Sequence, residues 1–298
     1  MRFDRCIELL ENYKRRKYNM PFSGHVPRKR FGQHWLRDDS ILEKILLAAD
    51  LQEEDRILEI GPGRGALTEK LLESNVKLVH GVELDAELIV GLKQRFAGQS
   101  RFTLQEGDAL SVSLLPHDGI AANKVVANIP YNITGPLLER LIGRLGRSSE
   151  VKYQRLVLLV QKEVAKRILA LPGQSSFSAM SVRLQLLAKC QSVCEVHPSS
   201  FSPQPKVYSE VIILDPLEKD ERLDFLVERR VASIVQIAFL SRRKKLRNTL
   251  TKICPLDELE PLAYRQGINL NQRPQELAPM IWVQLARELE RWDRSKKK

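Results

Sequence analysis

The sequence is poor in cysteine, and its few cysteines are far apart. The 298 residues include four of them, at Cys6, Cys190, Cys194 and Cys254. This number and spacing do not make the framework of a disulfide-stabilised domain. Cys190 and Cys194 could pair as metal ligands, but a zinc site needs a second pair of Cys or His residues, and none follows nearby. The sequence therefore predicts reduced thiols, no metal site and a cytoplasmic protein.

Long hydrophobic runs are also absent. The longest strongly apolar stretches, at 156–160 and 211–214, have the length of β-strands, whereas a membrane span needs roughly 18 apolar residues. The composition, 43% hydrophobic and 29% charged, is that of a globular protein with no membrane partner. The length suits one large domain and a smaller one.

The positive charge of the chain is unevenly distributed. The net charge is +11, yet the segments 1–30, 242–247 and 291–298 carry +6, +5 and +4, so the remainder carries −4. Basic clusters on a slightly acidic body are typical of a protein that binds a polyanion. Any one of these clusters could instead be a solvated face or a loose end. Together they favour nucleic acid as the partner.

The first 27 residues form a basic N-terminal extension. They contain three acidic residues and no apolar core followed by a cleavage site, so they do not resemble a secretory signal. They also lack the serine-rich, acid-poor composition of a transit peptide. Two interpretations stay open: a basic arm, or translation that begins at Met20.

From residue 55 the sequence alternates strand-like and helix-like stretches. This alternation predicts an α/β fold, a Rossmann-like, mainly parallel sheet with helices on both faces. The last two strands could form an antiparallel edge. The predicted strands are 56–60, 78–83, 102–106, 124–127, 156–160, 192–196 and 210–214, and the predicted helices are 66–74, 86–96, 135–145, 163–171 and 178–189.

Strand signals stop after Asp215 and Pro216. Residues 220–298 have apolar positions at helical spacing, for example Val231, Ile234 and Val235. We therefore predict a large α/β domain over 28–215 and a small all-helical C-terminal domain over 216–298.

The first chemical motif is a glycine-rich turn between a strand and a helix. It reads Glu59-Ile-Gly61-Pro-Gly63-Arg-Gly65, and Glu83 ends the next predicted strand, 22 positions after Gly61. Glycines let the main chain approach a ligand, and the helix start offers free amide donors. A carboxylate at this distance suits the two hydroxyls of a ribose. The pattern is closer to the first motif of class I methyltransferases than to a dinucleotide fold, and predicts a nucleoside-type cofactor.

Asp108, in Gly107-Asp108-Ala109, follows the third strand. An aspartate there can accept a hydrogen bond from an adenine amine, although it could also simply cap a turn. The neighbouring motifs favour the ligand role.

The third motif is Asn128-Ile129-Pro130-Tyr131, at the carboxyl end of the fourth strand, where open α/β sheets place their sites. Asn and Pro also favour plain turns. The same residue types nevertheless match methyltransferases that act on a planar amino group. If the Asn128 oxygen and the Ile129 carbonyl accept the amine hydrogens, the lone pair turns out of the ring towards the methyl. Pro130 stiffens the turn, and Tyr131 can stack on a flipped base.

Several motifs, in order from about residue 28 to 289, closely resemble the ribosomal RNA adenine dimethyltransferases, specifically the bacterial KsgA/RsmA type that modifies the small subunit. Arg28-Lys-Arg-Phe-Gly-Gln-His-Trp-Leu36 resembles the family's opening motif, whose last residues line the cofactor pocket, although the usual form has Asn-Phe at His34-Trp35. By this likeness His34 and Leu36 contact the cofactor. Segment 196–207, with Phe201-Ser-Pro203-Gln-Pro205, resembles the late F-x-P-x-P-x-V segment, and Phe201 would stack on the target adenine opposite Tyr131.

Segment 239–250 resembles the basic helix of the family's C-terminal domain. The RNA-binding residues expected there are Arg242, Arg243, Lys244, Lys245 and Arg247.

The resemblance implies a monomeric enzyme that uses S-adenosyl-L-methionine and acts on 16S rRNA in the small ribosomal subunit precursor. Its products would be two adjacent adenosines near the 3′ end, each dimethylated at the exocyclic amine. Three alternatives stay open. They are a large-subunit adenine methyltransferase of the erythromycin-resistance type, a DNA adenine methyltransferase, and a non-catalytic RNA-binding assembly or transcription factor on the same fold.

Overall fold

The computed structural model describes residues 32–296. The predicted extension 1–27, the first residues of the opening motif, and Lys297 and Lys298 lie outside the described residues.

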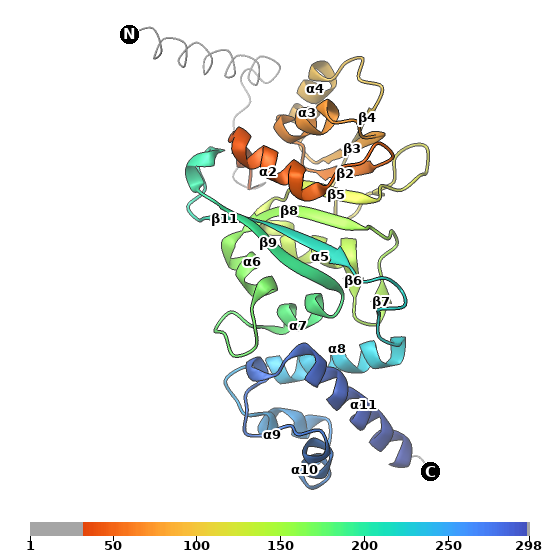
Figure 1. Ribbon diagram of the computed structural model, residues 1–298, viewed down its shortest axis with the longest axis vertical. Helices are drawn as coiled ribbons and strands as arrows, with labels where there is room; N and C mark the ends of the chain where they lie inside the picture. Colours follow the sequence, from red (N-terminus) through yellow and green to blue (C-terminus); the bar gives the residue numbers. More distant parts are fainter. Residues whose placement is uncertain (1–31, 297–298) are drawn as a thin grey trace. The chain divides into compact units, whose positions relative to one another are not determined.

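A seven-stranded sheet forms the centre of the fold (Figure 1). Its strand order is β4-β3-β2-β5-β8-β11-β9, and the neighbouring strands from β4 to β8 run parallel to one another. The predicted Rossmann-like sheet is confirmed, with the late strands adjacent at one edge. The strands are β2 (Arg56–Ile60), β3 (Leu78–Glu83), β4 (Phe102–Glu106), β5 (Lys124–Asn128), β8 (Arg155–Gln161), β9 (Ala188–Val196) and β11 (Ser209–Pro216).

Three helices share one hydrophobic core with the sheet: α2 (Asp39–Ala49), α3 (Ala66–Glu73) and α4 (Ala86–Arg95). Alternate strand residues such as Ile57, Val79 and Val126 face this core, as period-2 alternation requires. Asp38 and Asp85 cap the starts of α2 and α4 by accepting main-chain N–H groups of Ser40 and Glu87. These carboxylates satisfy main-chain N–H groups of the first turn that have no partner within the helix.

Two predicted helices end three or four residues earlier than the sequence pattern indicated. The helix predicted over 135–145 is α5 (Thr134–Ile142), because Gly143 has φ +90° and leads into the short strands β6 (Gly143–Arg144) and β7 (Arg147–Ser148). The helix predicted over 178–189 is α7 (Ala179–Gln185), and β9 already begins at Ala188. The strand β9 has largely polar, partly exposed residues, so its first half lacks the apolar alternation that identifies a strand. The helix α6 is Lys162–Leu169.

The C-terminal part is helical, as predicted, with no strand among described residues 217–296. Its helices are α8 (Phe225–Phe239), α9 (Leu246–Thr249), α10 (Leu256–Arg265) and α11 (Pro279–Lys296). The apolar face of α8, with Val231, Ile234 and Val235, is buried, and Phe239 contacts Trp282 of α11 at 5.9 Å between ring centroids.

The prediction of one basic helix over 239–250 is wrong, because the chain turns within this segment. Helix α8 ends at Phe239, and residues 241–244 form a turn in which the Lys244 N–H donates to the Ser241 carbonyl (2.8 Å). Lys245 is the extended residue before α9, so Arg247 is helical and the rest of the basic run is not. The apolar spacing pauses between Leu240 and the buried Leu246, and the chain turns there.

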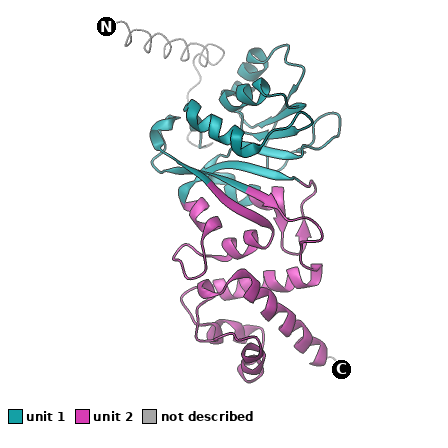
Figure 2. Ribbon diagram, in the orientation of Figure 1, with its two compact units in different colours: residues 1–137, 153–162, 193–213 teal, residues 138–152, 163–192, 214–298 magenta. Residues whose placement is uncertain are grey.

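The described chain forms two compact units (Figure 2). One contains the chain up to residue 137 with 153–162 and 193–213, and the other contains 138–152, 163–192 and 214 onwards. The predicted boundary between the two domains at residue 215 stays a prediction, because these compact units do not test whether each domain folds independently.

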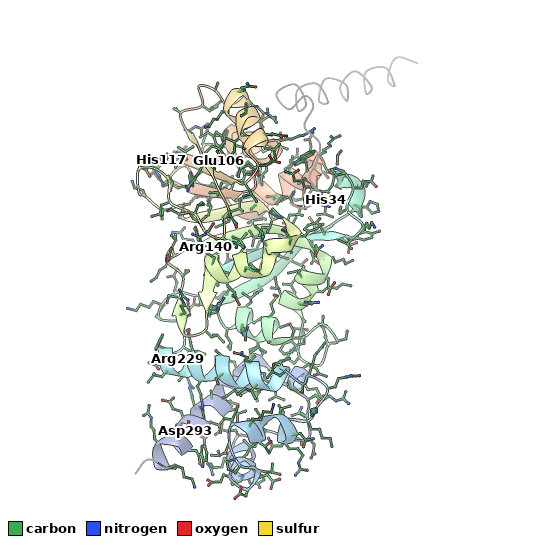
Figure 3. The ribbon with its side chains drawn as sticks, turned by 180° about the vertical axis from the view of Figure 1, so that it is seen from behind. His34, Glu106, His117, Arg140, Arg229 and Asp293 are labelled. Atoms are coloured by element: carbon green, nitrogen blue, oxygen red, sulfur yellow. The ribbon has the colours of Figure 1, made fainter. Side chains whose placement is uncertain are left out.

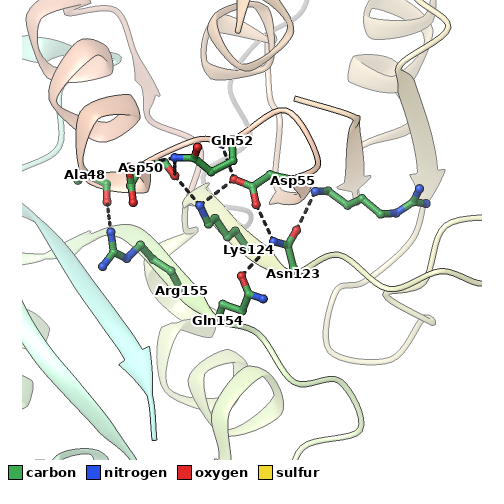
Figure 4. A network of polar contacts seen from close by, with 9 residues as sticks. Ala48, Asp50, Gln52, Asp55, Asn123, Lys124, Gln154 and Arg155 are labelled. Atoms are coloured by element: carbon green, nitrogen blue, oxygen red, sulfur yellow. Dashed lines mark hydrogen bonds and ion pairs between the residues drawn. The ribbon is translucent and has the colours of Figure 1, made fainter. Parts of the chain in front are cut away.

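A buried polar network joins the amino ends of β2 and β5 (Figure 4). The Lys124 Nζ donates to Asp55 Oδ2 (2.7 Å) and to the Asp50 carbonyl (2.5 Å). Asn123 Nδ2 donates to Asp55 Oδ1 (2.6 Å), and the Gln52 N–H donates to Oδ2 (2.7 Å). Burial would raise the pKa of Asp55, but these donors outweigh it and lower the pKa. The network fixes the register of the strands at the end of the sheet opposite the glycine-rich turn.

Candidate active site

A cavity of about 300 Å³ lies where the carboxyl ends of β2, β3, β4 and β5 meet. The structure brings most of the predicted site residues together around it. Those that line it are His34, Gly61, Gly63, Glu83, Asp108, Asn128, Ile129, Pro130 and Tyr131. Consecutive parallel strands end at one edge, so polar side chains that are far apart in sequence converge on one space.

The glycine-rich turn lies close to Trp35. Gly61 and Gly63 have φ of +68° and +61°, the left-handed region that favours glycine. A Cβ atom on Gly63 would lie 2.8 Å from Trp35 Cδ1, so there is no room for a side chain. The turn therefore exposes main chain to the cavity.

Glu83 is the last residue of β3 and is only 6% exposed. Its Oε1 accepts the N–H groups of Leu84 (2.9 Å) and Asp85 (3.0 Å), and its Oε2 accepts that of Gly63 (3.0 Å). Burial raises the pKa of the Glu83 carboxyl, and the three N–H donors offset only part of this. The carboxyl group is thus held rigidly, with three of its roughly four acceptor positions used and the remaining one on Oε2.

Asp108 lies beyond β4 at the same edge. Its Oδ1 accepts the N–H of Leu110 (2.9 Å), and no hydrogen bond within the described residues uses Oδ2. Gly107 has φ +148°, and a Cβ there would lie 2.2 Å from Val112 Cγ1. The turn brings an acceptor oxygen to the cavity.

Asn128 ends β5, and its amide orientation is set by the main chain of the opening motif. Its Nδ2 donates to the His34 carbonyl (3.0 Å), so the oxygen Oδ1 points away from this bond. No described residue donates to Oδ1. The side chain is therefore held with a free acceptor in a cavity that it shares with Ile129 and Pro130.

Tyr131 and His34, which both line the cavity, are stacked on each other. Their ring centroids are 5.7 Å apart with an interplanar angle of 26°. The Tyr131 hydroxyl hydrogen-bonds Ser209 Oγ (2.6 Å), and burial raises its pKa. His34, labelled in Figure 3, lies 2.8 Å through Nδ1 from the Pro203 carbonyl, so Nδ1 carries a hydrogen.

Two predicted site residues do not line this cavity. Leu36 and Phe201 pair across the two-stranded β1 (Trp35–Leu36) and β10 (Phe201–Ser202), and both belong to the hydrophobic core. Leu36 lines a smaller adjoining cavity that shares Trp35, Gly61 and Asn128. The Phe201 ring is 3% exposed, so in this arrangement it offers no face to a base.

Glu59, at the start of the glycine-rich motif, is fully buried in that smaller cavity. Burial raises the pKa of its carboxyl to about 8, which the Thr68 hydroxyl, donating at 2.6 Å, only partly offsets. A pKa raised in this way favours the protonated carboxyl at neutral pH.

The family of the chain follows from comparison with known proteins. The model of the family described as ribosomal RNA adenine dimethylase matches residues 24–291. This chain belongs to the ribosomal RNA adenine dimethylase family. Relatives named ribosomal RNA small subunit methyltransferase A from Prochlorococcus marinus (strain MIT 9211) and Synechococcus sp. (strain WH7803) are 64% and 63% identical to it. Each alignment covers 92% of this chain and 98% of the relative.

Solved structures agree with this membership. A dimethyladenosine transferase from Plasmodium falciparum is 28% identical over 87% of this chain and 98% of its own, with a TM-score of 0.74. The 23S rRNA methyltransferase ErmE is 22% identical over 86% of this chain and 99% of its own, with a TM-score of 0.68. This second likeness concerns the fold.

Sequence reasoning missed several residues that line the cavity of this family member. Among them are Gln33, Trp35, Val82, Leu88, Gly107 and Asn132. Gln33 and Trp35 flank His34 in the opening motif, and this adjacency was the available signal. Leu88 comes from α4, and an apolar helix residue gives no sign in the sequence that it faces a ligand.

The basic cluster at 242–247 occupies the turn after α8 and the start of α9. Arg242 donates to the Ser175 carbonyl, Arg247 pairs with Glu260 (3.0 Å), and Lys245 approaches Asn271 (3.4 Å). Arg243 and Lys244 are exposed, and no described residue forms an ion pair or hydrogen bond with their side chains. Within residues 32–296 there is no helix that is long and apolar enough to cross a bilayer, and no group of three potential metal ligands.

Proposed function

We propose that the protein transfers methyl groups from S-adenosyl-L-methionine to the exocyclic N6 amines of two adjacent adenosines near the 3′ end of 16S rRNA. The observation that carries the chemistry is the orientation of Asn128, whose free Oδ1 shares a cavity with Glu83 and Asp108. The names of the small-subunit relatives support the choice of RNA.

The carboxylate acceptors and the glycine-rich main chain around the cavity fit the proposed cofactor. Glu83 would accept from a ribose hydroxyl through Oε2 and Asp108 Oδ2 from the adenine amine, while the main chain at Gly61 and Gly63 approaches closely. The methyl group is carried on a sulfonium, which leaves as a neutral thioether. A volume of about 300 Å³ is at the lower end of the usual range for ligand pockets, and the smaller adjoining cavity lined by Leu36 adds to this space.

The residues of the chain prepare the amine. An adenine amine is conjugated to its ring and is a poor nucleophile. Asn128 Oδ1 and the Ile129 carbonyl would accept its two hydrogens and turn the lone pair towards the methyl, while Pro130 keeps the carbonyl in place. The methylated aminium is strongly acidic and gives up its proton without a dedicated base.

Tyr131 would stack on the flipped adenine, and this requires His34 to yield part of the face that it covers. The role proposed for Phe201 on the opposite face requires its ring to leave the core. Leu36 would support the cofactor through the smaller cavity. The His34 ring would contact the cofactor in the cavity. The main-chain carbonyl of His34 would orient Asn128 by accepting its side-chain N–H.

The RNA-binding residues are proposed to be Arg242, Arg243, Lys244, Lys245 and Arg247. Arg243 and Lys244 are the most available to phosphates, since the other three contact protein groups. We further propose that the protein acts as a cytoplasmic monomer on the small-subunit precursor.

The test is to incubate the protein and labelled S-adenosylmethionine with undermethylated small subunits, naked small-subunit RNA and large-subunit RNA. Mass spectrometry of nuclease fragments then locates the modified bases. We expect two adjacent dimethyladenosines near the 3′ end of the small-subunit RNA. Methylation of large-subunit RNA alone, or of none of the three, would overturn the proposal.

A further inference from the structure

An exposed tyrosine lies next to the active site and is flanked by a cation and an imidazole. Tyr208 is 43% exposed. The Lys162 Nζ lies over its ring at 5.3 Å from the centroid. The His197 ring meets it edge to face, with 5.1 Å between centroids and an interplanar angle of 87°. We call Lys162, His197 and Tyr208 the rim triad.

The sheet places this triad beside the catalytic motif. Lys162 directly follows β8, His197 directly follows β9 and Tyr208 directly precedes β11, the strand between them. The Lys162 N–H donates to the Tyr208 carbonyl (3.0 Å). Ser209, the next residue, hydrogen-bonds the Tyr131 hydroxyl, and adjacent Cα atoms are about 3.8 Å apart. Tyr208 is thus one residue from a direct contact of the base-stacking tyrosine.

The packing of the triad restricts each side chain. Lys162 also pairs with Glu195, so its ammonium is held near the ring, and a phosphate would share the ammonium with this carboxylate. The His197 Nδ1 accepts the N–H of Ser199 (3.1 Å), which fixes the orientation of the imidazole. A tyrosine that is positioned from two sides and still exposed loses little conformational entropy when a flat ligand stacks on it.

We propose that the rim triad binds the nucleotide adjacent to the target adenosine, with its base stacked on Tyr208 and its phosphate near Lys162. An aromatic face combined with a cation is the chemistry by which proteins hold unpaired nucleotides. The inference rests on the proposed function, in which two adjacent adenosines are modified and one must lie outside the cavity while the other is inside. The triad gives that neighbouring base a place to stack.

Two readouts test this inference. In the first, a small-subunit stem-loop RNA carries the fluorescent base 2-aminopurine in place of the neighbouring adenosine. Stacking quenches this fluorescence, so we expect quenching by the wild-type protein, by Tyr208→Phe and by the matched control Tyr264→Ala. Tyr264 is 87% exposed and belongs to the other compact unit. Tyr208→Ala should abolish the quenching.

The second readout is steady-state kinetics on undermethylated small subunits. Tyr208→Ala should raise KM for the subunit about 5- to 100-fold, because one base–aromatic stack contributes roughly 1–3 kcal/mol and 1.4 kcal/mol is tenfold. Tyr208→Phe keeps the ring and should remain near the wild-type value. Lys162→Gln should raise KM less, and should flatten its dependence on salt. Cofactor affinity by calorimetry should be unchanged in each variant, which establishes that the cavity is intact.

The failures are distinguishable. If the wild-type protein makes no dimethyladenosine on small subunits, the proposed function is wrong. If it does, but Tyr208→Ala keeps both the quenching and the wild-type KM, the rim triad only packs the ends of the strands and this inference is overturned. A loss that appears equally in Tyr264→Ala would also overturn it, since the effect would then not depend on the position of the ring.

Discussion

The side-chain amide of Asn128 donates a hydrogen bond of 3.0 Å to the main-chain carbonyl of His34, 94 residues earlier in the sequence. This bond joins the opening motif to the end of β5 and decides which end of the amide is free. An acceptor is needed to orient an amine, and a freely rotating amide would present its NH₂ group for part of the time. The contact with the opening motif therefore leaves the acceptor end of the amide free, as the proposed role of Asn128 requires.

We expect Asn128→Ala to reduce single-turnover methylation about 10²- to 10³-fold, a loss of the size seen when one preorganised hydrogen-bonding group is removed from a transition state. The dissociation constant for RNA should change far less. Rapid-quench kinetics with mass spectrometry of the products would measure the first rate, and filter binding the second. Dimethyladenosine formed at the wild-type rate would contradict the role of Asn128.

Glu83→Ala should weaken binding of S-adenosylmethionine by about 1–2 kcal/mol through loss of hydrogen bonds to a charged acceptor. Titration calorimetry measures this directly. The matched control is Glu106→Ala, at the end of the neighbouring strand β4, where the side chain is exposed (Figure 3). Equal affinities for Glu83→Ala and the wild-type protein would remove Glu83 from the site.

Reversing the charge of Arg243 and Lys244 should weaken binding to many RNAs. The slope of log K against log salt should also become shallower, by roughly 1 for each phosphate that the protein no longer neutralises. Both side chains are exposed and form no ion pair or hydrogen bond with other described residues, so their replacement leaves the turn after α8 intact. Affinities measured between low and moderate salt give the slope. An unchanged slope places the turn outside the RNA interface.

Phe201 and Tyr131 should respond differently to truncation. The Phe201 ring is in the hydrophobic core, so Phe201→Ala should lower the free energy of unfolding by about 3–5 kcal/mol. Tyr131 is half-buried at the cavity, and Tyr131→Ala should chiefly slow methylation. Urea denaturation and product kinetics on both variants would separate the effects. A Phe201→Ala protein of wild-type stability would show that the ring does not support the core.

The order of the elements was predictable because strand–helix alternation and glycine-rich turns are local features. The positions of Gly61, Glu83, Asp108 and Asn128 at strand ends followed from it, since parallel strands bring their carboxyl ends together. Contacts between distant segments had no such signal. Phe201 illustrates this: the motif gives its identity, but only the pairing of β1 with β10 buries its ring.

The prediction that the basic run at 242–247 is helical was wrong for a related reason. Arg and Lys have good helix propensity, so nothing local ends the helix at Phe239. The chain turns because the buried Leu246 has to join a separate helix, and this depends on tertiary packing. The burial of Glu59 was also not predictable, since its position in the motif does not indicate how deeply the side chain is buried.

The buried carboxyl of Glu59 should make the stability of the protein without cofactor fall as pH rises. Burial raises the pKa of Glu59 from 4.5 to about 8 in the folded state. Between these two values the folded chain holds a proton that the unfolded chain has lost, so unfolding is favoured progressively as pH increases. The contribution is fully present below pH 4.5 and is lost as pH rises to about 8. Glu59→Gln resembles the protonated acid and cannot ionise.

We therefore expect the free energy of unfolding of Glu59→Gln, measured in urea between about pH 5 and 8, to fall less with pH than that of the wild-type protein. His80 acts in the opposite direction at lower pH, because burial lowers its pKa from 6.5 to about 4 and stability rises over that window. Burial also raises the pKa of Glu83, so the pH dependence assigned to Glu59 is the difference between the Glu59→Gln and wild-type profiles, and a His80→Gln background removes the overlap below pH 6.5. Parallel pH profiles for Glu59→Gln and wild type would mean that Glu59 is already ionised in the folded protein, and that its burial is relieved by a cation or by water.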